Sequence, residues 1–205
     1  MRKRHAASAI CCFLTVGTAN VAAQQPKGAL GIEAARRGGV VLACRHGITS
    51  SDDEDEMTLR YEDPSTQRRL SAAGERQSEA LGKAFRALRI SVVEVIASPM
   101  QRARRTAEPF GEPRLDSTWH TRGSNYEGPK REFRLEVLGK PVAGGNRVIV
   151  SHTGTLLSTM PSVRGAFEEG DCVVVRPLGG RQLEVIDVVP WRAWLQAAGI
   201  REPTP

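Results

Sequence analysis

The 205-residue sequence predicts an α/β fold with three layers, in which helices cover both faces of a mostly parallel central sheet. Short apolar runs at residues 40–44, 91–97 and 147–151 are typical of strands that are buried on both faces. Segments with helical spacing separate these runs, and such alternation favours a parallel sheet. The length suits one domain with a substantial core.

The N-terminal segment has the three parts of a secretory signal peptide. Positions 2–4 are basic, residues 6–19 form a short apolar stretch, and residues 21–23 (Val-Ala-Ala) are small enough for cleavage. We therefore predict a signal peptide over residues 1–23 and a mature protein that is periplasmic or secreted.

The chain that remains after cleavage would consist of a lead-in over residues 24–38 and one domain over residues 39–205. Cleavage removes three of the 29 Lys and Arg residues and none of the 23 Asp and Glu residues, which leaves a net charge of +3. This mild charge does not indicate a nucleic-acid partner. Since no later stretch approaches the roughly 20 apolar residues of a membrane span, we expect no stable membrane insertion after cleavage.

Two cysteines, Cys44 and Cys172, remain in the mature chain, each in a predicted strand. An oxidising compartment would permit a disulfide between them. Burial in strands favours two free thiols instead. The sequence does not decide between these states.

A helix is predicted over residues 71–89, with Ser71 as its N-cap. Its apolar positions share one face at helical spacing and are Ala73, Ala80, Leu81, Ala84, Phe85 and Leu88. After the second strand, Ser98 and Pro99 predict another helix start, with serine as cap and proline at the first helical position. This helix ends near residue 107.

The secondary structure expected after residue 110 is partly irregular. Residues 111–125 show no regular pattern, and residues 177–180 form the turn of a predicted hairpin. A helix is expected at 127–139, before the third strand. After that strand, the expected elements are hairpin strands at 172–176 and 183–189 and a closing helix at 190–198.

Cationic side chains follow all three central strands. Arg45, His46 and Gly47 follow the first strand, Arg102 lies shortly after the second, and His152 follows the third. In parallel sheets, ligands bind beyond the carboxyl ends of the strands. Arginine forks suit phosphate oxygens, and the start of a helix favours an anion. The sequence therefore predicts a site for a compact dianion at this edge.

These motifs resemble those of the histidine phosphatase superfamily, which has the phosphoglycerate-mutase-like fold. The resemblance extends from about residue 40 to the end of the chain, and its last segment is similar to the small exported bacterial branch. The matching segments are residues 45–47, 63–71 with Gly74, 98–103 with 106–108, 150–152, and 169–171 with Trp191.

The resemblance implies a phosphomonoester hydrolase that forms a phosphohistidine on His46. Arg45, Arg102 and His152 would hold the phosphoryl oxygens. The hydroxyl of Thr49 would add a donor to the phosphate, or would face water. No metal or other cofactor is expected, because arginines and imidazoles neutralise the charge. The expected substrate is a phosphorylated small molecule or a phosphoprotein.

The proton donor for the leaving group is less clearly indicated. Many relatives have a glutamate in a Leu-x-Glu segment after the second-arginine helix, which residues 115–116 and 126–127 resemble only faintly. Glu169 is the first candidate for this acid and Asp116 the second, although a solvated carboxylate is the ordinary interpretation of each. His120 is interpreted as an ordinary loop residue.

Other functions remain open. A phosphoglycerate-mutase-like phosphotransferase would share the motifs, but export argues against it. A non-catalytic phosphate-binding or envelope protein would not need a nucleophilic imidazole. A metalloenzyme fits poorly, since the sequence has no His-x-x-x-His or Cys-x-x-Cys pair. The acidic run at residues 52–56 is interpreted as a solvated loop that could also repel anions or bind a cation.

Overall fold

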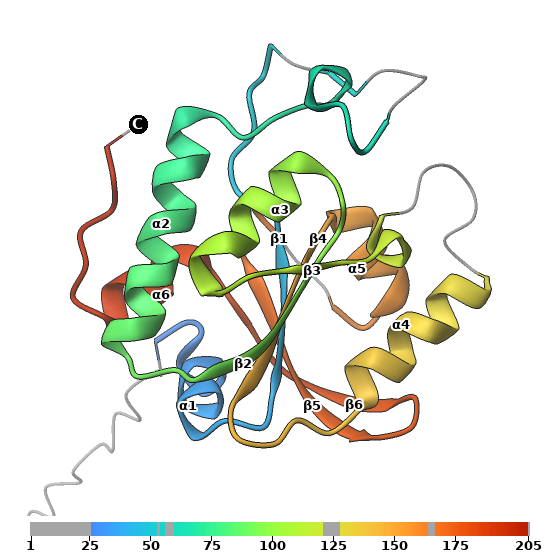
Figure 1. The fold of residues 1–205 in the computed structure, drawn as a ribbon. Coiled ribbons are helices and arrows are strands. Elements are labelled where there is room, and N and C mark those ends of the chain that lie inside the picture. Colours follow the sequence, from blue (N-terminus) through green and yellow to red (C-terminus); the bar gives the residue numbers. More distant parts are fainter. Residues whose placement is uncertain (1–25, 53, 56–59, 121–127, 164–166, 205) are drawn as a thin grey trace, which may run out of the picture.

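A six-stranded sheet with the order β3-β2-β4-β1-β5-β6 forms the centre of the molecule (Figure 1). The computed structural model describes residues 26–52, 54–55, 60–120, 128–163 and 167–204. The strands are β1 (Val41–Arg45), β2 (Val92–Ala97), β3 (Arg114–Leu115), β4 (Asn146–Ser151), β5 (Cys172–Gly179) and β6 (Gln182–Val189). The helices are α1 (Ala29–Arg37), α2 (Ala72–Ala87), α3 (Gln101–Ala107), α4 (Pro129–Gly139), α5 (Thr153–Thr159) and α6 (Trp191–Ala197). The 3₁₀ turns are η1 (Pro64–Thr66), η2 (Glu108–Phe110) and η3 (Ser117–Trp119).

Four strands are parallel and meet at one edge. β4 pairs in parallel with β1 on one side and with β2 on the other, and β2 pairs in parallel with β3. β5 runs antiparallel to β1, and β6 completes the predicted hairpin. The carboxyl ends of β1, β2 and β4 therefore lie side by side, as the alternating sequence pattern predicts.

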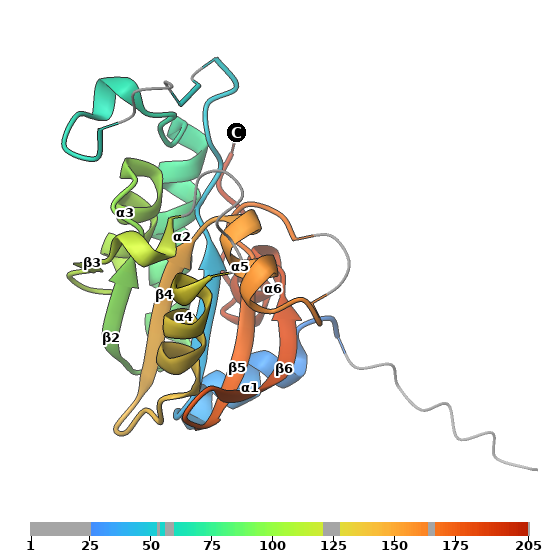
Figure 2. The same cartoon turned by 90° about the vertical axis from the view of Figure 1, so that its right-hand side faces the viewer.

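Helices cover both faces of the sheet, which confirms the predicted three-layer α/β class (Figure 2). One apolar cluster joins α1, α2, α3 and α6 to one face of the sheet. A second cluster joins α4, α5 and Trp119 to the opposite face. In α2, the predicted apolar stripe is buried from Ala80 onward, and Ser71 caps the helix by accepting from the amide of Gly74 at 3.1 Å.

Three local predictions differ from the structure. Residues of the expected lead-in form α1, which packs against β6 and places its Gly31 amide 3.1 Å from Asp187 Oδ2. The segment without a regular pattern contains β3 and η3. The helix after β2 begins at Gln101, with Met100 and not Ser98 at its N-cap position.

Cys44 and Cys172 form a disulfide, so the favoured interpretation as two free thiols was wrong. The two residues face each other directly in the antiparallel pair of β1 and β5, and their Cα atoms are 4.0 Å apart. Both are buried. The bridge joins the strand that leads to His46 with the strand that follows Glu169. Within the described residues, no helix is both long and apolar enough to cross a membrane.

Candidate active site

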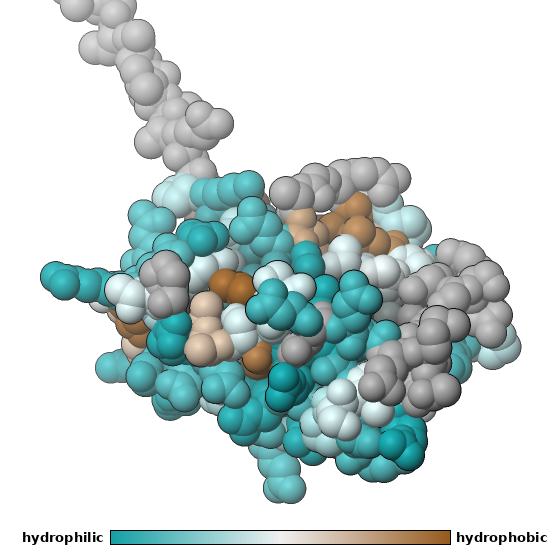
Figure 3. Space-filling model, turned by 90° about the horizontal axis from the view of Figure 1, so that it is seen from above, coloured by the Kyte–Doolittle hydropathy of each residue, from teal (hydrophilic) through white to brown (hydrophobic). Residues whose placement is uncertain are grey.

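The predicted site residues come together at the carboxyl edge of the parallel strands. His46 follows β1, His152 follows β4, and Arg102 lies in the first turn of α3 after β2. The His46 amide donates to the Ser151 carbonyl at 3.0 Å, which joins the ends of β1 and β4. Seen from above, this face of the molecule is mainly hydrophilic, with smaller apolar areas between the polar residues (Figure 3).

The ring of His46 is buried and oriented by its neighbour. Its Nδ1 lies 2.9 Å from the Gly47 carbonyl, which can only accept a hydrogen bond. Nδ1 is therefore the protonated nitrogen, and Nε2 carries the lone pair. Burial and the positive charges of Arg102, Arg45 and Arg68 lower the pKa of His46 to about 3, so the ring is neutral at pH 7.

The loop that follows His46 is fixed by α2 and α3. The Gly47 amide donates to Thr106 Oγ1 at 2.8 Å, and the Ile48 amide donates to Gln77 Oε1 at 3.0 Å. Gly74 allows this approach, since a Cβ atom there would lie 1.9 Å from the Ile48 carbonyl oxygen. The positions of His46 and of the first two turns of α2 are thus coupled.

Arg102 forms a bidentate ion pair with Asp55. Its Nη1 and Nη2 donate to Oδ1 and Oδ2 of Asp55 at 2.9 Å each, and the Arg68 amide also donates to Asp55 at 2.9 Å. Burial raises the pKa of Asp55, but the hydrogen bonds from Arg102 and Arg68 outweigh it and hold that pKa below its usual range. A carboxylate of the chain thus occupies the arginine fork that was predicted to bind phosphate.

Arg45 pairs with Glu169 on the other side of His46. Its Nη2 lies 3.2 Å from Glu169 Oε1, and its Nη1 donates to the Phe167 carbonyl at 3.0 Å. Thr49 donates its hydroxyl hydrogen to the same Glu169 oxygen at 2.9 Å. The Thr49 hydroxyl therefore contacts a carboxylate of the site and does not simply face water, while its donation to phosphate stays a prediction.

His152 packs beside His46, with the ring centroids 5.3 Å apart. Its Nε2 lies 2.9 Å from the Ser98 hydroxyl oxygen, which also accepts from the Met100 amide at 3.3 Å. Burial, together with His46 and the positive charge of Arg102, lowers the pKa of His152 well below its usual value. Both imidazoles of the site are therefore neutral at pH 7.

Several buried nitrogen atoms at this edge have no hydrogen-bond partner among the described residues. They are the Nε atoms of Arg45, Arg68 and Arg102 and the Nδ1 atom of His152. Buried polar atoms nearly always have partners, so a cluster of exceptions indicates a ligand. Three guanidinium groups and a histidine suit an oxyanion.

The sequence model of the "Histidine phosphatase superfamily (branch 1)" matches residues 41–122 of the chain. The matched part contains Arg45, His46 and Arg102. The chain is therefore similar in sequence to the histidine phosphatase superfamily over this part of its length. The predicted resemblance is thereby confirmed, and the branch-1 match covers the first two of the three strand ends that build the site.

Solved structures of histidine phosphatases and related proteins share the fold. The protein histidine phosphatase SixA complexed with tungstate superimposes with a TM-score of 0.57 at 15% identity, covering 75% of this chain and 97% of that one. A putative phosphohistidine phosphatase SixA from Agrobacterium tumefaciens gives 0.51 at 15% identity, covering 75% and 99%. A mutant phosphoserine phosphatase from Entamoeba histolytica with bound phosphoserine gives 0.53 at 12% identity, covering 75% and 98%. A comparison with curated protein sequences found no match.

The two candidate acids lie in different surroundings. Glu169 is in the site, 3.9 Å from Nδ1 of His46. Asp116 caps η3, since its Oδ1 accepts from the amide and hydroxyl of Thr118 at 2.9 and 2.6 Å. Its other oxygen lies 3.2 Å from Arg114. The weaker candidate Glu127 lies outside the described residues.

Sequence reasoning missed four residues of this site. Arg68 carries one of the buried nitrogens without a partner, and Asp55 pairs with Arg102. His120, interpreted as ordinary, packs against His152 with a centroid distance of 5.0 Å and bonds to Tyr61. The position of Arg68 within the matching segment 63–71 was a usable signal, whereas nothing in the sequence distinguished the other three.

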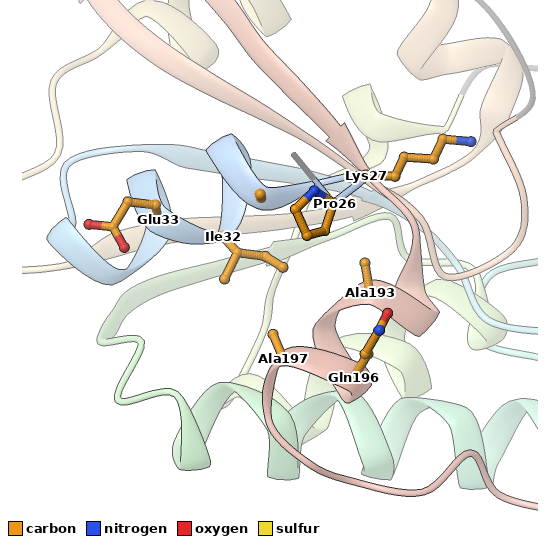
Figure 4. Close-up of a pocket in the computed structure, with 8 residues that line it drawn as sticks. Pro26, Lys27, Ile32, Glu33, Ala193, Gln196 and Ala197 are labelled. Atoms are coloured by element: carbon orange, nitrogen blue, oxygen red, sulfur yellow. The ribbon is translucent and has the colours of Figure 1, made fainter. Parts of the chain in front are cut away.

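Two cavities differ in their relation to the site. One of about 280 Å³ opens beside Arg45 and Glu169 and is also lined by Trp191 and Arg192. Another of about 330 Å³ lies between α1 and α6 and contains none of the residues at the strand ends (Figure 4). Of these two cavities, only the first therefore adjoins the site at the strand ends. Among the described residues, no group of three or more His, Cys, Asp or Glu side chains is arranged to hold a metal ion.

Proposed function

We propose that this chain is an exported phosphomonoester hydrolase that acts through a phosphohistidine on His46. One observation carries the proposal. A neutral imidazole with its lone pair on Nε2 lies among buried guanidinium and imidazole nitrogens that have no hydrogen-bond partner in the described part of the chain. Such a set binds a phosphoryl group and supplies the atom that attacks it.

In the proposed reaction, His46 Nε2 attacks phosphorus in line with the ester oxygen. The N–P bond forms while the P–O bond breaks, and the electron pair leaves with that oxygen. Arg102, Arg68 and His152 stabilise the charge on the equatorial oxygens, and the Gly47 carbonyl holds the proton on Nδ1. Water then attacks the phosphohistidine and releases phosphate. Nothing in this sequence of steps requires a metal ion.

Substrate binding requires a change at Arg102. Because Asp55 occupies both guanidinium nitrogens of the fork, the phosphate must displace this carboxylate or share the arginine with it. A dianionic phosphomonoester competes better for the fork than a monoanion does. The proposed substrates are therefore monoesters of small molecules or of proteins.

Export is the second part of the proposal. The signal-peptide pattern of residues 1–23 supports it, and a disulfide of the Cys44–Cys172 kind persists mainly in oxidising compartments. We expect a periplasmic or secreted protein whose mature chain begins near residue 24. Cell fractionation, with mass spectrometry of the mature N-terminus, tests this expectation.

The deciding experiment measures p-nitrophenyl phosphate hydrolysis in the presence of EDTA by the chain from residue 24 onward, and by its His46→Ala variant. We expect turnover that EDTA leaves intact and that disappears in the variant. Trapping of a phosphoenzyme that is labile in acid and stable in base provides the matching chemical evidence. Folding of both proteins is checked by circular dichroism.

Other outcomes would favour the alternatives. A folded protein that binds phosphate or vanadate without hydrolysing any monoester would support a non-catalytic binding protein. Transfer of the phosphoryl group to an added alcohol in preference to water would support a mutase-like phosphotransferase. Loss of turnover with EDTA would contradict the metal-independent mechanism.

A further inference from the structure

Four rings form a continuous series from the surface to the proposed nucleophile. The centroids of Tyr61 and His120 are 5.6 Å apart, those of His120 and His152 are 5.0 Å apart, and those of His152 and His46 are 5.3 Å apart. The Tyr61 hydroxyl lies 2.9 Å from His120 Nδ1. The third histidine of the domain is therefore directly adjacent to the phosphate site.

The main chain holds His120 firmly at the end of β4. The Ser151 hydroxyl donates to the Trp119 carbonyl at 2.6 Å, and the Trp119 side chain is completely buried. Arg134 donates to the Thr118 carbonyl at 2.9 Å, and Asp116 caps the turn that precedes His120. These contacts fix His120 relative to the strand that carries His152.

Tyr61 is held from the opposite side, by α3. Gln67 donates through Nε2 to the Tyr61 carbonyl at 3.0 Å and accepts through Oε1 from the Gln101 amide at 2.7 Å. Gln101 precedes the phosphate-binding Arg102. The pair of Tyr61 and His120 thus joins two loops that come from either side of the site.

The carboxylates expected to act as the acid are less well placed. Glu169 lies on the Nδ1 side of the His46 ring, whereas the leaving oxygen must depart in line on the far side of a phosphorus atom bound to Nε2. The oxygens of Asp116 are engaged with Thr118 and Arg114. Within the described part of the chain, His120 is the titratable group that lies next to His152 on the outer side of the site.

We propose that His120, positioned by Tyr61, exchanges the proton with the leaving group. This inference rests on the proposed phosphatase function. In the first step, the P–O bond breaks and the ester oxygen takes a proton from Nε2 of the His120 imidazolium, which yields the alcohol and a neutral ring. Tyr61 accepts from Nδ1–H throughout, so the neutral ring keeps its proton on Nδ1.

The second step returns His120 to its starting state. Water attacks the phosphohistidine, the N–P bond breaks, and its electron pair returns to Nε2 of His46. The proton that water loses goes to Nε2 of His120. Over both steps, one water and one monoester give one alcohol and one phosphate, and both histidines are restored.

The test compares leaving groups of different basicity. Esters of p-nitrophenol, phenol and a primary alcohol are assayed with the wild type, His120→Gln and Tyr61→Phe. A lost general acid costs more when the leaving group is more basic, and such acids contribute about 10²–10⁴-fold. We expect His120→Gln to lower kcat/KM about 10²-fold or more for the alkyl ester and about 10-fold or less for the p-nitrophenyl ester. Tyr61→Phe should also lower kcat/KM more for the alkyl ester than for the p-nitrophenyl ester, but by a smaller factor than His120→Gln.

Three matched variants test the rival acids, namely Glu169→Gln, Asp116→Asn and Glu127→Gln. The proposal is overturned if His120→Gln lowers kcat/KM by the same factor for all three esters. It is also overturned if one of these carboxylate variants, and not His120→Gln, makes the loss of kcat/KM depend on the leaving group. Added imidazole should restore alkyl-ester hydrolysis to His120→Ala, which a purely structural role of His120 does not predict. Absence of turnover in the wild type would instead contradict the phosphatase function itself.

Discussion

Arg102 and Arg45 flank the same histidine, and each contacts a carboxylate, but the two carboxylates are held differently. Glu169 belongs to the framework, since its carbonyl accepts from Gln77 at 2.8 Å and the next amide, that of Gly170, donates to the His46 carbonyl at 3.0 Å. Asp55 lies in the acidic run, and its carboxylate contacts Arg102 and the Arg68 amide, groups that belong to the phosphate site.

The two pairs also differ in geometry. Arg102 engages both oxygens of Asp55 in a fork, whereas Arg45 makes one 3.2 Å contact with Glu169 and turns its other nitrogen to a carbonyl. A phosphate can replace Asp55 with equal hydrogen bonds, but replacing Glu169 would also disturb Thr49. From this comparison we propose that Asp55 would compete with a bound phosphate and that Glu169 positions Arg45 and the loop after His46.

The largest effect is expected from removal of Arg102. Loss of one donor to a developing oxyanion typically costs about 10²–10³-fold, so Arg102→Ala should lower kcat/KM for p-nitrophenyl phosphate about 10³-fold. Arg102→Lys should lie between this variant and the wild type, since lysine keeps the charge and loses the fork. A loss below about tenfold for Arg102→Ala would place phosphate elsewhere.

Removal of the disulfide, which joins β1 to the strand that follows Glu169, should lower the stability of the protein. The bridge links positions 128 residues apart in the sequence. Replacing Cys44 and Cys172 together with alanine should lower the free energy of unfolding by about 2–4 kcal/mol, as measured in urea. A reducing agent should have the same effect on the wild type and none on the double variant. Equal stability of oxidised wild type and variant would contradict the bridge's role.

Acid should destabilise the protein through His46. In the unfolded chain this histidine takes up a proton as the pH falls below 6.5, whereas in the folded protein its pKa is about 3. Stability is therefore complete above pH 6.5 and is lost as the pH falls towards 3. Between pH 7 and pH 5, the wild type should lose about 2 kcal/mol more than His46→Gln. Parallel unfolding curves for both proteins would show that His46 is not buried as a neutral ring.

The smallest expected effect comes from replacing the carboxylates of Asp55 and Glu169 one at a time, which tests whether their roles differ. Asp55→Asn frees Arg102, so KM for a phosphomonoester and the Ki for vanadate should fall about fivefold, which corresponds to about 1 kcal/mol for a partly exposed pair. Glu169→Gln should instead raise KM or lower kcat. Changes in the same direction for both variants would abolish the distinction between a competing and a positioning carboxylate.

The sequence predicted what depends on local patterns. The apolar runs that became β1 and β4 are continuous and short, so their carboxyl ends and the residues that follow, His46 and His152, could be located in advance. The disulfide could not, because it depends on the register that places Cys44 opposite Cys172 across an antiparallel pair. The apolar character and the length of a run can be read from one segment, whereas strand register depends on how two distant segments pair.

The contacts of Asp55 and His120 were beyond prediction for a related reason. Both lie in segments without periodicity, and their partners are 47 and 59 residues away in the sequence. A solvated aspartate and one in an arginine fork look the same in a sequence. Ser98 was predicted only as a local helix cap, whereas its hydroxyl also contacts the distant His152.

The position of β4 has a consequence for the time course of folding. β1 and β2 follow each other along the chain, yet they are not paired, because β4 lies between them. A growing chain that ends before residue 146 therefore has no central sheet, and the edge that holds His46 cannot close until β4 has been inserted. Closing such long loops is slow. A precursor of this kind completes its central sheet only after β4 has been made, which is compatible with the export proposed above.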